Sequence, residues 1–204
     1  MMKRKEHWER VYAEKSPTEV SWYQLRPTLS LHLIQNCGLD KDEAVIDIGG
    51  GASVLVDHLL NDAWTRLSVL DISSRSLEHV KGRLGEKASQ IEWFEADITE
   101  FEPPHAYSLW HDRAVFHFLT DPDDRKKYVE VLNRTLRPGG FLILAAFAIG
   151  GPLKCSGLDI VQYDAQKLLG ELGDNFELVE ETGEIHMTAA NTEQQFGYFR
   201  LLKK

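Results

Sequence analysis

An aspartate and three glycines stand together directly after a short apolar run of the chain. Asp47 lies two residues before Gly49, which Gly50 and Gly51 follow. Because glycine has no Cβ, it adopts positive φ readily and lets a ligand approach the main chain closely. A carboxylate beside such a turn repels a phosphate and attracts an ammonium group. These residue types favour a turn that binds a positively charged ligand, although a tight turn without a ligand would also use glycine.

Two familiar glycine-rich turns do not match this stretch. A phosphate-binding loop needs the pattern G-x-x-x-x-G-K-[ST], and no lysine follows these glycines. A dinucleotide-binding turn needs G-x-G-x-x-G/A, whereas the sixth position counted from Gly49 is Val54. These differences disfavour nucleoside triphosphates and dinucleotides as the ligand.

Two more carboxylates end strand-like runs of the sequence. Asp71 ends the run SVLD, and Asp97 ends FEAD. Each residue taken alone could cap the helix or loop that follows it. Together with Asp47 they stand beyond consecutive predicted strands, and ligands of open parallel sheets bind at that edge. Their joint placement predicts one ligand site that contains all three carboxylates.

The segment WHDRAVFHF, from residue 110, follows the fourth predicted strand and carries two histidines. His111 could act as a base near neutral pH, and a contact to a bound ligand or the backbone is an equal alternative. His117 is expected to pack on a helix face. The two histidines lack a third ligand at a suitable spacing, so no metal site is predicted.

The elements that must position these residues alternate along the chain. Strands are predicted for five short apolar runs, at residues 44–48, 66–72, 91–97, 107–112 and 141–148. Helices are predicted around them, at residues 28–36, 53–61, 73–84 and 123–136. The alternation predicts a mainly parallel sheet with helices on both faces. A helix at 164–172 and longer strands at 176–187 and 194–204 then predict an antiparallel hairpin at one edge.

The charge balance argues against nucleic acid as a partner. The net charge is −9, and the basic cluster Arg125-Lys126-Lys127 directly follows a run that contains three aspartates. A protein that binds a duplex normally presents a basic face to the phosphates. The cluster is therefore interpreted as the solvated start of a helix.

The remaining composition is that of an ordinary globular protein. Cys37 and Cys155 belong to no C-x-x-C pair and are expected to be reduced, partly buried thiols. No run of eighteen apolar residues is present, and the first ten residues lack the apolar core of a secretory signal. A cytoplasmic protein without a membrane partner is therefore expected.

The glycine turn resembles motif I of the class I S-adenosylmethionine-dependent methyltransferases. The matching residues are Asp47-x-Gly49-x-Gly51. The family often has a third glycine where this chain has Ser53, which can donate to the ligand or cap the helix. The resemblance implies that Asp47, the three glycines and Ser53 hold the methionine end of S-adenosylmethionine.

Further motifs resemble the same family in the expected order. In the family, an acid at the end of the second strand binds the ribose hydroxyls, and this position is Asp71, followed by Ile72. An acid or amide after the third strand meets the adenine amino group, and here it is Asp97, followed by Ile98. The turn at residues 137–140, RPGG, is similar to the family's turn before the fifth strand.

The N-terminal segment carries four aromatic residues and is predicted to form a helical lid over residues 1–40. It resembles the segment that precedes the core in methyltransferases of the thiopurine type and in some protein-lysine methyltransferases. Trp22 and Tyr23 are expected in the cofactor cleft, where aromatic faces stabilise a sulfonium. Trp8 and Tyr12 are expected to anchor the helix on the edge of the sheet.

The resemblance also places the transferred methyl group at the end of the fourth strand. His111, Asp112 and Arg113 are therefore the candidate catalytic residues, and His111 is also a candidate cofactor contact. The protein is expected to act mainly by aligning the acceptor with the methyl group. The Asn-Pro-Pro-Tyr sequence of enzymes that methylate adenine N6 or glutamine is absent.

The sequence thus predicts an α/β protein with the three-layer Rossmann-like class I methyltransferase fold. Its mainly parallel seven-stranded sheet would end in an antiparallel C-terminal hairpin. Residues 1–204 would form one domain, with the core at 41–204. The expected activity is methyl transfer from S-adenosylmethionine to a small molecule, leaving S-adenosylhomocysteine. Alternatives are methylation of a protein lysine, a cofactor-binding module without catalysis, and a nicotinamide oxidoreductase of related fold.

Overall fold

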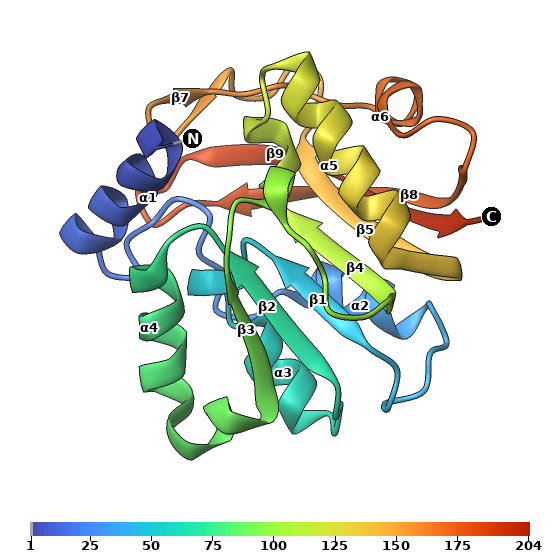
Figure 1. Ribbon diagram of the computed structural model, residues 1–204. Coiled ribbons are helices and arrows are strands. Elements are labelled where there is room, and N and C mark those ends of the chain that lie inside the picture. Colours follow the sequence, from blue (N-terminus) through green and yellow to red (C-terminus); the bar gives the residue numbers. More distant parts are fainter. Residues whose placement is uncertain (1) are drawn as a thin grey trace.

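A seven-stranded sheet forms the centre of the computed structural model, in the order β3-β2-β1-β4-β5-β9-β8 (Figure 1). The structure describes residues 2–204, with side chains from residue 4, so Met1 of the predicted lid lies outside it. The strands of this sheet are β1 (Val45–Ile48), β2 (Leu67–Asp71), β3 (Ile91–Glu95), β4 (Tyr107–Arg113), β5 (Leu136–Phe147), β8 (Phe176–Met187) and β9 (Glu193–Lys203). Strands β1 to β5 run parallel, and β9 is antiparallel to β5 and β8. The predicted sheet and its C-terminal hairpin are confirmed.

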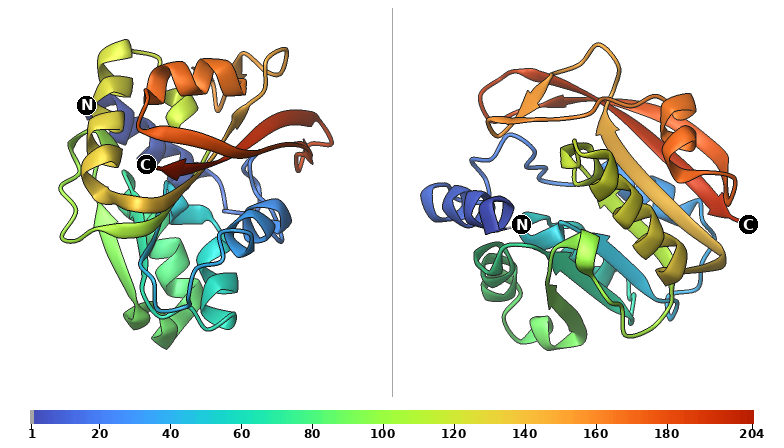
Figure 2. Two further views of the ribbon diagram at one scale, coloured as in Figure 1. Left: turned by 90° about the vertical axis from the view of Figure 1, so that its right-hand side faces the viewer. Right: turned by 45° about the horizontal axis from the view of Figure 1, so that its top comes forward.

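Helices cover both faces of the sheet and complete three layers (Figure 2). They are α1 (Met2–Glu14), α2 (Thr28–Gln35), α3 (Leu55–Asn61), α4 (Ser74–Leu84), α5 (Pro122–Thr135) and α6 (Ala165–Leu172). One hydrophobic cluster joins α5 and α6 to the sheet, and a second cluster joins α2, α3 and α4 to its other face. Strands β1 and β2 are buried along their whole length because they lie between these two layers.

Local capping explains where several helices begin. Ser73 accepts a hydrogen bond from the backbone N–H of Ser76 at the start of α4, as predicted. Helix α3 starts at Leu55, two residues later than predicted. The reason is that a short 3-10 helix (Gly50–Ala52) first carries the chain out of the glycine turn. The hydroxyl of Ser53 accepts from the Leu55 N–H at 2.9 Å.

The segment Arg137-Pro138-Gly139-Gly140 was predicted as a turn before the fifth strand, but it lies within β5. Leu136 pairs with Tyr107, and the next paired residue, Phe141, faces Leu109. The intervening residues form a bulge, in which Gly139 adopts a φ of 74°. Strand β5 therefore begins five residues earlier than the apolar pattern indicated.

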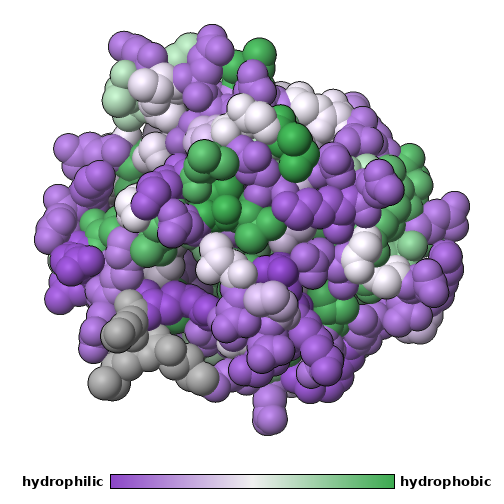
Figure 3. Space-filling view, turned by 90° about the horizontal axis from the view of Figure 1, so that it is seen from above, coloured by the Kyte–Doolittle hydropathy of each residue, from purple (hydrophilic) through white to green (hydrophobic). Residues whose placement is uncertain are grey.

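Helix α1 lies across the carboxyl ends of β1 and β2, beside α4 (Figures 1 and 2). The Glu9 carboxylate accepts from the backbone N–H of Ser74 at 2.7 Å, which fixes α1 to the first turn of α4. A small hairpin of β6 (Lys154–Cys155) and β7 (Leu158–Asp159), which was not predicted, lies between β5 and α6. Seen from above, the surface is mostly hydrophilic, with hydrophobic side chains gathered near its middle (Figure 3).

Candidate functional site

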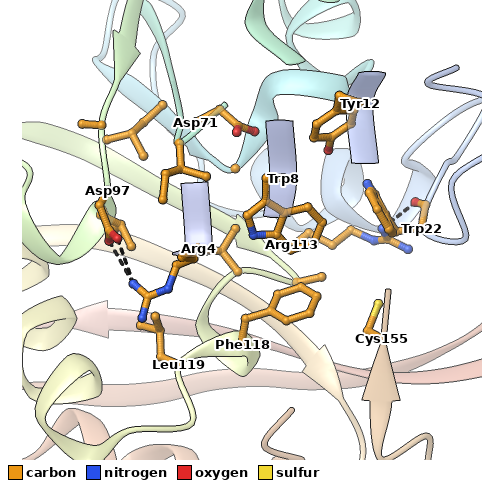
Figure 4. Close-up of a pocket in the computed structure, with 17 residues that line it drawn as sticks. Arg4, Trp8, Tyr12, Trp22, Asp71, Asp97, Arg113, Phe118, Leu119 and Cys155 are labelled. Atoms are coloured by element: carbon orange, nitrogen blue, oxygen red, sulfur yellow. Dashed lines mark hydrogen bonds and ion pairs between the residues drawn. The ribbon is translucent and has the colours of Figure 1, made fainter. Parts of the chain in front are cut away.

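A cavity of about 90 Å³ lies where β1, β2 and β4 end, under helix α1 (Figure 4). The sheet contributes the predicted pairs Asp71–Ile72 and Asp97–Ile98 to its wall. The rest of the wall comes from the lid, from the segment after β4 and from β6: Arg4, Trp8, Tyr12, Trp22, Phe118 and Cys155. The cavity therefore combines carboxylates with aromatic rings in its lining.

A second, smaller cavity of about 40 Å³ continues from the first. Three residues, Trp22, Gly49 and Arg113, line both cavities. Its other predicted lining residues are Tyr23, Asp47, Gly50, Ser53 and His111. The two cavities thus adjoin at these shared residues, at the carboxyl edge of the sheet where the sequence predicted the ligand site.

The glycine turn has no room for side chains. Gly49 adopts a φ of 68°, and a Cβ there would lie 2.2 Å from Val115. A Cβ on Gly50 would lie 2.4 Å from Asp47 Oδ2, and one on Gly51 would lie 2.0 Å from Ser76 Oγ. Bare main chain at these positions lets the turn close over β1, and at Gly49 it faces both cavities.

Asp47 is held by one side chain, His111, which Ser30 holds in turn, and keeps one oxygen free. Its Oδ1 lies 2.6 Å from His111 Nδ1, and His111 Nε2 lies 2.9 Å from Ser30 Oγ. Asp47 and His111 are direct partners in the parallel pairing of β1 with β4, which brings their side chains together. The other oxygen, Oδ2, is buried and has no hydrogen-bond partner within residues 2–204. A buried carboxylate oxygen without a donor fits a site whose ligand supplies an ammonium group.

Asp71 acts as a local cap and also lines the cavity. Its two oxygens accept from the backbone N–H groups of Gly51 (3.1 Å) and Ser73 (2.9 Å). Burial raises the pKa of this carboxyl group to about 6, against the lowering effect of those hydrogen bonds. Each carboxylate oxygen has a second lone pair, so Asp71 can still accept from a ligand hydroxyl.

Asp97 is engaged by a residue that the sequence reading missed. Arg4 Nη1 donates to both oxygens of Asp97, at 2.9 and 3.2 Å (Figure 4). The second terminal nitrogen of Arg4 pairs with Asp124 at the start of α5. Asp97 Oδ1 also accepts from the N–H and hydroxyl of Thr99. Arg4 precedes the aromatic residues of the lid in the sequence and belongs to no motif that predicts a ligand contact.

Of the three candidate catalytic residues, the structure brings His111 and Arg113 to the site but not Asp112. Alternate residues of a strand point to opposite faces, so Asp112 points away toward α5. It is fully buried and accepts from the hydroxyl of Tyr128 (2.7 Å) and the N–H of Val115 (2.9 Å). Burial raises the pKa of Asp112 to about 6. Its contacts are those of a residue that fixes the loop after β4.

Arg113 connects four segments of the chain beside both cavities. Its guanidinium donates to the hydroxyl of Tyr198 (2.8 Å) and to the backbone oxygen of Trp22 (2.9 Å, Figure 4). It lies 3.5 Å from Glu184 and 4.5 Å above the ring of Phe196. These contacts join the end of β4 to the lid, β8 and β9.

Aromatic rings from the lid and from the loop after β4 pack against one another. The Trp8 ring lies edge-to-face with Trp22 at 5.6 Å and with Phe118 at 5.0 Å. Trp22 was predicted to face the cleft, whereas Trp8 and Tyr12 were expected only to anchor the helix. All of them line the larger cavity, because α1 lies across the cleft instead of on the sheet edge. Phe118 carried no signal in the sequence.

His117 and the two cysteines are buried. His117 packs against Phe147, and burial lowers its pKa to about 3. Cys37 follows α2 and its thiol donates to the backbone oxygen of Leu33, whereas Cys155 lines the larger cavity. Burial raises the pKa of Cys155 to about 11. Among residues 2–204, no three His, Cys, Asp or Glu side chains are placed to hold a metal ion. Within the same range no helix has the length and hydrophobicity to cross a membrane.

Comparisons with known proteins agree with this geometry. A family model described as "Methyltransferase domain" matches residues 46–142. The human protein "EEF1A lysine methyltransferase 2" is 24% identical over 193 residues, which cover 87% of this chain and 75% of that protein. The chain spans 22%, 49% and 42% of the lengths of three further relatives that it matches.

Two solved structures share the fold over almost the whole chain. A methyltransferase from Anabaena variabilis, described as dependent on S-adenosylmethionine, has a TM-score of 0.77 and 14% identity, covering 98% of this chain and 95% of its own. The N-methyltransferase NodS from Bradyrhizobium japonicum, in complex with S-adenosyl-L-homocysteine, has a TM-score of 0.66 and 18% identity. That match covers 94% of this chain and 97% of NodS.

The strand order, the glycine turn and the matched domain together define the class I methyltransferase fold. The protein is an S-adenosylmethionine-dependent methyltransferase, and S-adenosyl-L-methionine is its cofactor. The resemblance, the fold class and the cofactor inferred from the sequence are thereby confirmed.

Proposed function

We propose that this methyltransferase transfers the methyl group to an amine nitrogen of a small molecule. The main support for the cofactor site is Asp47 Oδ2, which is buried beside the glycine turn without a hydrogen-bond partner among the described residues. This oxygen could accept a hydrogen bond from the ammonium group at the methionine end of the cofactor. Asp71 would accept from the ribose hydroxyls and Asp97 from the adenine amino group. Ile72 and Ile98 line the same cavity and would pack on the nucleoside.

The aromatic wall supports nitrogen as the methyl acceptor. Trp8, Trp22 and Phe118 line the same cavity as the two carboxylates that would hold the nucleoside. An apolar wall favours a neutral amine over an ammonium, and aromatic faces then stabilise the positive charge that develops on nitrogen. Arg113 also borders the cavity, but its positive charge is partly compensated by the carboxylate of Glu184, and its Nε–H donates to the hydroxyl of Tyr198. Its charge therefore opposes a developing positive charge on nitrogen less strongly.

When bound, S-adenosylmethionine supplies a methyl group on a sulfonium: the nitrogen lone pair forms the new N–C bond, and the electrons of the broken C–S bond stay on sulfur. The chain's own residues align the two reactants. Asp47 and the glycines would fix the methionine end. Trp22 and Arg113, which line both cavities, would border the transferred methyl, and the lid excludes water. The methylated ammonium then releases its proton to solvent.

A protein lysine is the second candidate acceptor. The relative named as an EEF1A lysine methyltransferase aligns with 87% of this chain, and NodS is described as an N-methyltransferase. Both descriptions concern nitrogen acceptors. The acidic balance of the chain, with a net charge of −9, would attract a basic protein segment and repel nucleic acid.

The test follows the methyl group from labelled S-adenosylmethionine into cell extract that has been separated by size. Label in the small-molecule fraction, on nitrogen by mass spectrometry, supports the proposal. Label in the protein fraction supports the lysine alternative. Cofactor binding without label in either fraction would identify a module without catalysis, and methylation of sulfur or oxygen would refute an amine acceptor. The cytoplasmic location and the single-domain organisation stay predictions.

A further inference from the structure

Three buried side chains from three different elements form a hydrogen-bonded chain beneath the smaller cavity. They are Asp47 on β1, His111 on β4 and Ser30 on α2, with exposures of 4%, 3% and 0%. The two hydrogen bonds measure 2.6 and 2.9 Å. All three residues line the cavity that would hold the methionine end of the cofactor. Buried polar groups in such a chain fix one another's orientation.

The chemistry of the donors and acceptors determines how the chain runs. A carboxylate only accepts, so His111 Nδ1 carries a hydrogen and donates to Asp47 Oδ1. In the neutral ring Nε2 is then an acceptor, and it receives the hydroxyl hydrogen of Ser30. Both ring nitrogens are therefore engaged. An imidazole in this state has no free nitrogen with which to take a proton from a methyl acceptor.

The consequence of this arrangement is the placement of Asp47 Oδ2. Because Oδ1 is fixed by His111, Oδ2 is held against the glycine turn, where a Cβ on Gly50 would lie 2.4 Å away. It is the oxygen without a partner among the described residues. A second donor that held Asp47 from the Oδ2 side would occupy the place of the ligand, and residues 4–204 supply no such donor.

We infer that His111 and Ser30 are positioning residues for the cofactor: they orient Asp47 so that Oδ2 receives the α-ammonium of S-adenosylmethionine. This inference rests on the proposed cofactor site. It replaces the two sequence-based alternatives for His111, a base or a direct ligand contact, with a role exerted through Asp47. Ser30 joins the site from α2, where no sequence motif marked it.

The test compares two nucleosides that differ only at the relevant end. S-Adenosylhomocysteine carries the amino-acid portion, whereas 5′-methylthioadenosine has the same nucleoside and thioether sulfur without it. The matched variants are His111→Asn, whose amide can occupy the place of Nδ1 and donate to Asp47, and His111→Gln, whose amide reaches toward Ser30 instead. Ser30→Ala is a milder third variant. Calorimetry gives both affinities, and a thermal melt reports folding.

The expected result is selective for the amino-acid end. His111→Gln should weaken S-adenosylhomocysteine about tenfold or more, since a hydrogen bond to a charged group is lost, and leave 5′-methylthioadenosine within about twofold. His111→Asn should retain most of the affinity. Ser30→Ala should cost about two- to fivefold on S-adenosylhomocysteine alone.

Equal weakening of both nucleosides by His111→Gln and Ser30→Ala would overturn the inference, because it would show a general structural role. Unchanged affinity for both would overturn it as well. If the unmodified protein binds neither nucleoside, the cofactor site itself is wrong and the inference falls with it. Should His111→Gln fail to fold, the selectivity of Ser30→Ala decides between these outcomes.

Discussion

We predict that Arg4 competes with the adenine base for Asp97, so that removing its guanidinium strengthens cofactor binding. The guanidinium donates to both oxygens of Asp97, the carboxylate expected to accept from the adenine amino group. We therefore expect the base to approach this carboxylate more readily once the Arg4 contact is broken. Arg4→Met keeps an apolar stem of similar length on α1 and removes the competing charge.

The magnitude follows from the burial of the pair. The Asp97 side chain is 7% exposed, whereas that of Arg4 is 27% exposed. A buried hydrogen bond to a charged group contributes about 1.5–3 kcal/mol, and an exposed ion pair about 0.2–1 kcal/mol. An intermediate value of about 1–2 kcal/mol corresponds to a roughly 5–30-fold lower Kd for S-adenosylhomocysteine in the variant.

Isothermal calorimetry with S-adenosylhomocysteine measures this difference. Raising the salt from about 0.05 to 0.5 M should strengthen binding to the unmodified protein, because the ion pair is screened, and should change Arg4→Met little. Lys5→Met is the matched control. It removes a charge from the next residue of α1, whose pair with Glu95 is exposed and lies off the cavity. If Arg4→Met binds the nucleoside no better than the unmodified protein, the competition does not exist.

Three further predictions concern the glycine turn, the backbone and pH. Gly51→Ala places a methyl group 2.0 Å from Ser76 Oγ, so it should abolish nucleoside binding and lower the free energy of unfolding by about 1–3 kcal/mol. The control is Gly82→Ala, at an open position in α4, which should raise the free energy of unfolding by about 0.5–1 kcal/mol. Urea melts measure both changes. Ala63 is exposed with a φ of 63°, and Ala63→Gly should raise the free energy of unfolding by about 0.5–1 kcal/mol; a lower midpoint would contradict this. Because burial raises the pKa of Asp71 to about 6, the carboxylate is protonated and loses acceptor capacity as the pH falls through 6. The affinity for S-adenosylhomocysteine should then fall from pH 7 to 5, and Asp71→Asn should bind weakly at both pH values.

The sheet and the carboxylate edge could be predicted because their signals are local. Apolar runs bounded by glycine and serine specify strands and caps, and the position of Asp47, Asp71 and Asp97 near the ends of such runs places them at one edge. Parallel pairing then brings together residues that are far apart in the sequence. The bulge at residues 137–140 escaped prediction because a turn and a bulge use the same glycine chemistry.

The rest of the site depends on packing that the sequence does not reveal. Whether α1 lies on the sheet edge or across the cleft decides the roles of Arg4 and Trp8, and neither arrangement has a distinct pattern. Ser30 is one of several serines in the chain, and only its tertiary hydrogen bond with His111 distinguishes it as a residue of the site. Asp112 shares a motif with its neighbours, yet the strand pleat turns it toward α5.

The contacts of Arg113 have a consequence for how this protein can change over evolutionary time. One guanidinium bridges the main chain at Trp22 and the hydroxyl of Tyr198, and His186 and Gln24 add two further hydrogen bonds between the lid and the C-terminal hairpin. A replacement in the hairpin would therefore displace the lid, although the two segments are some 175 positions apart in the chain. We therefore expect new acceptor preferences to arise through paired substitutions in both segments, while the carboxylates proposed to bind the nucleoside stay unchanged.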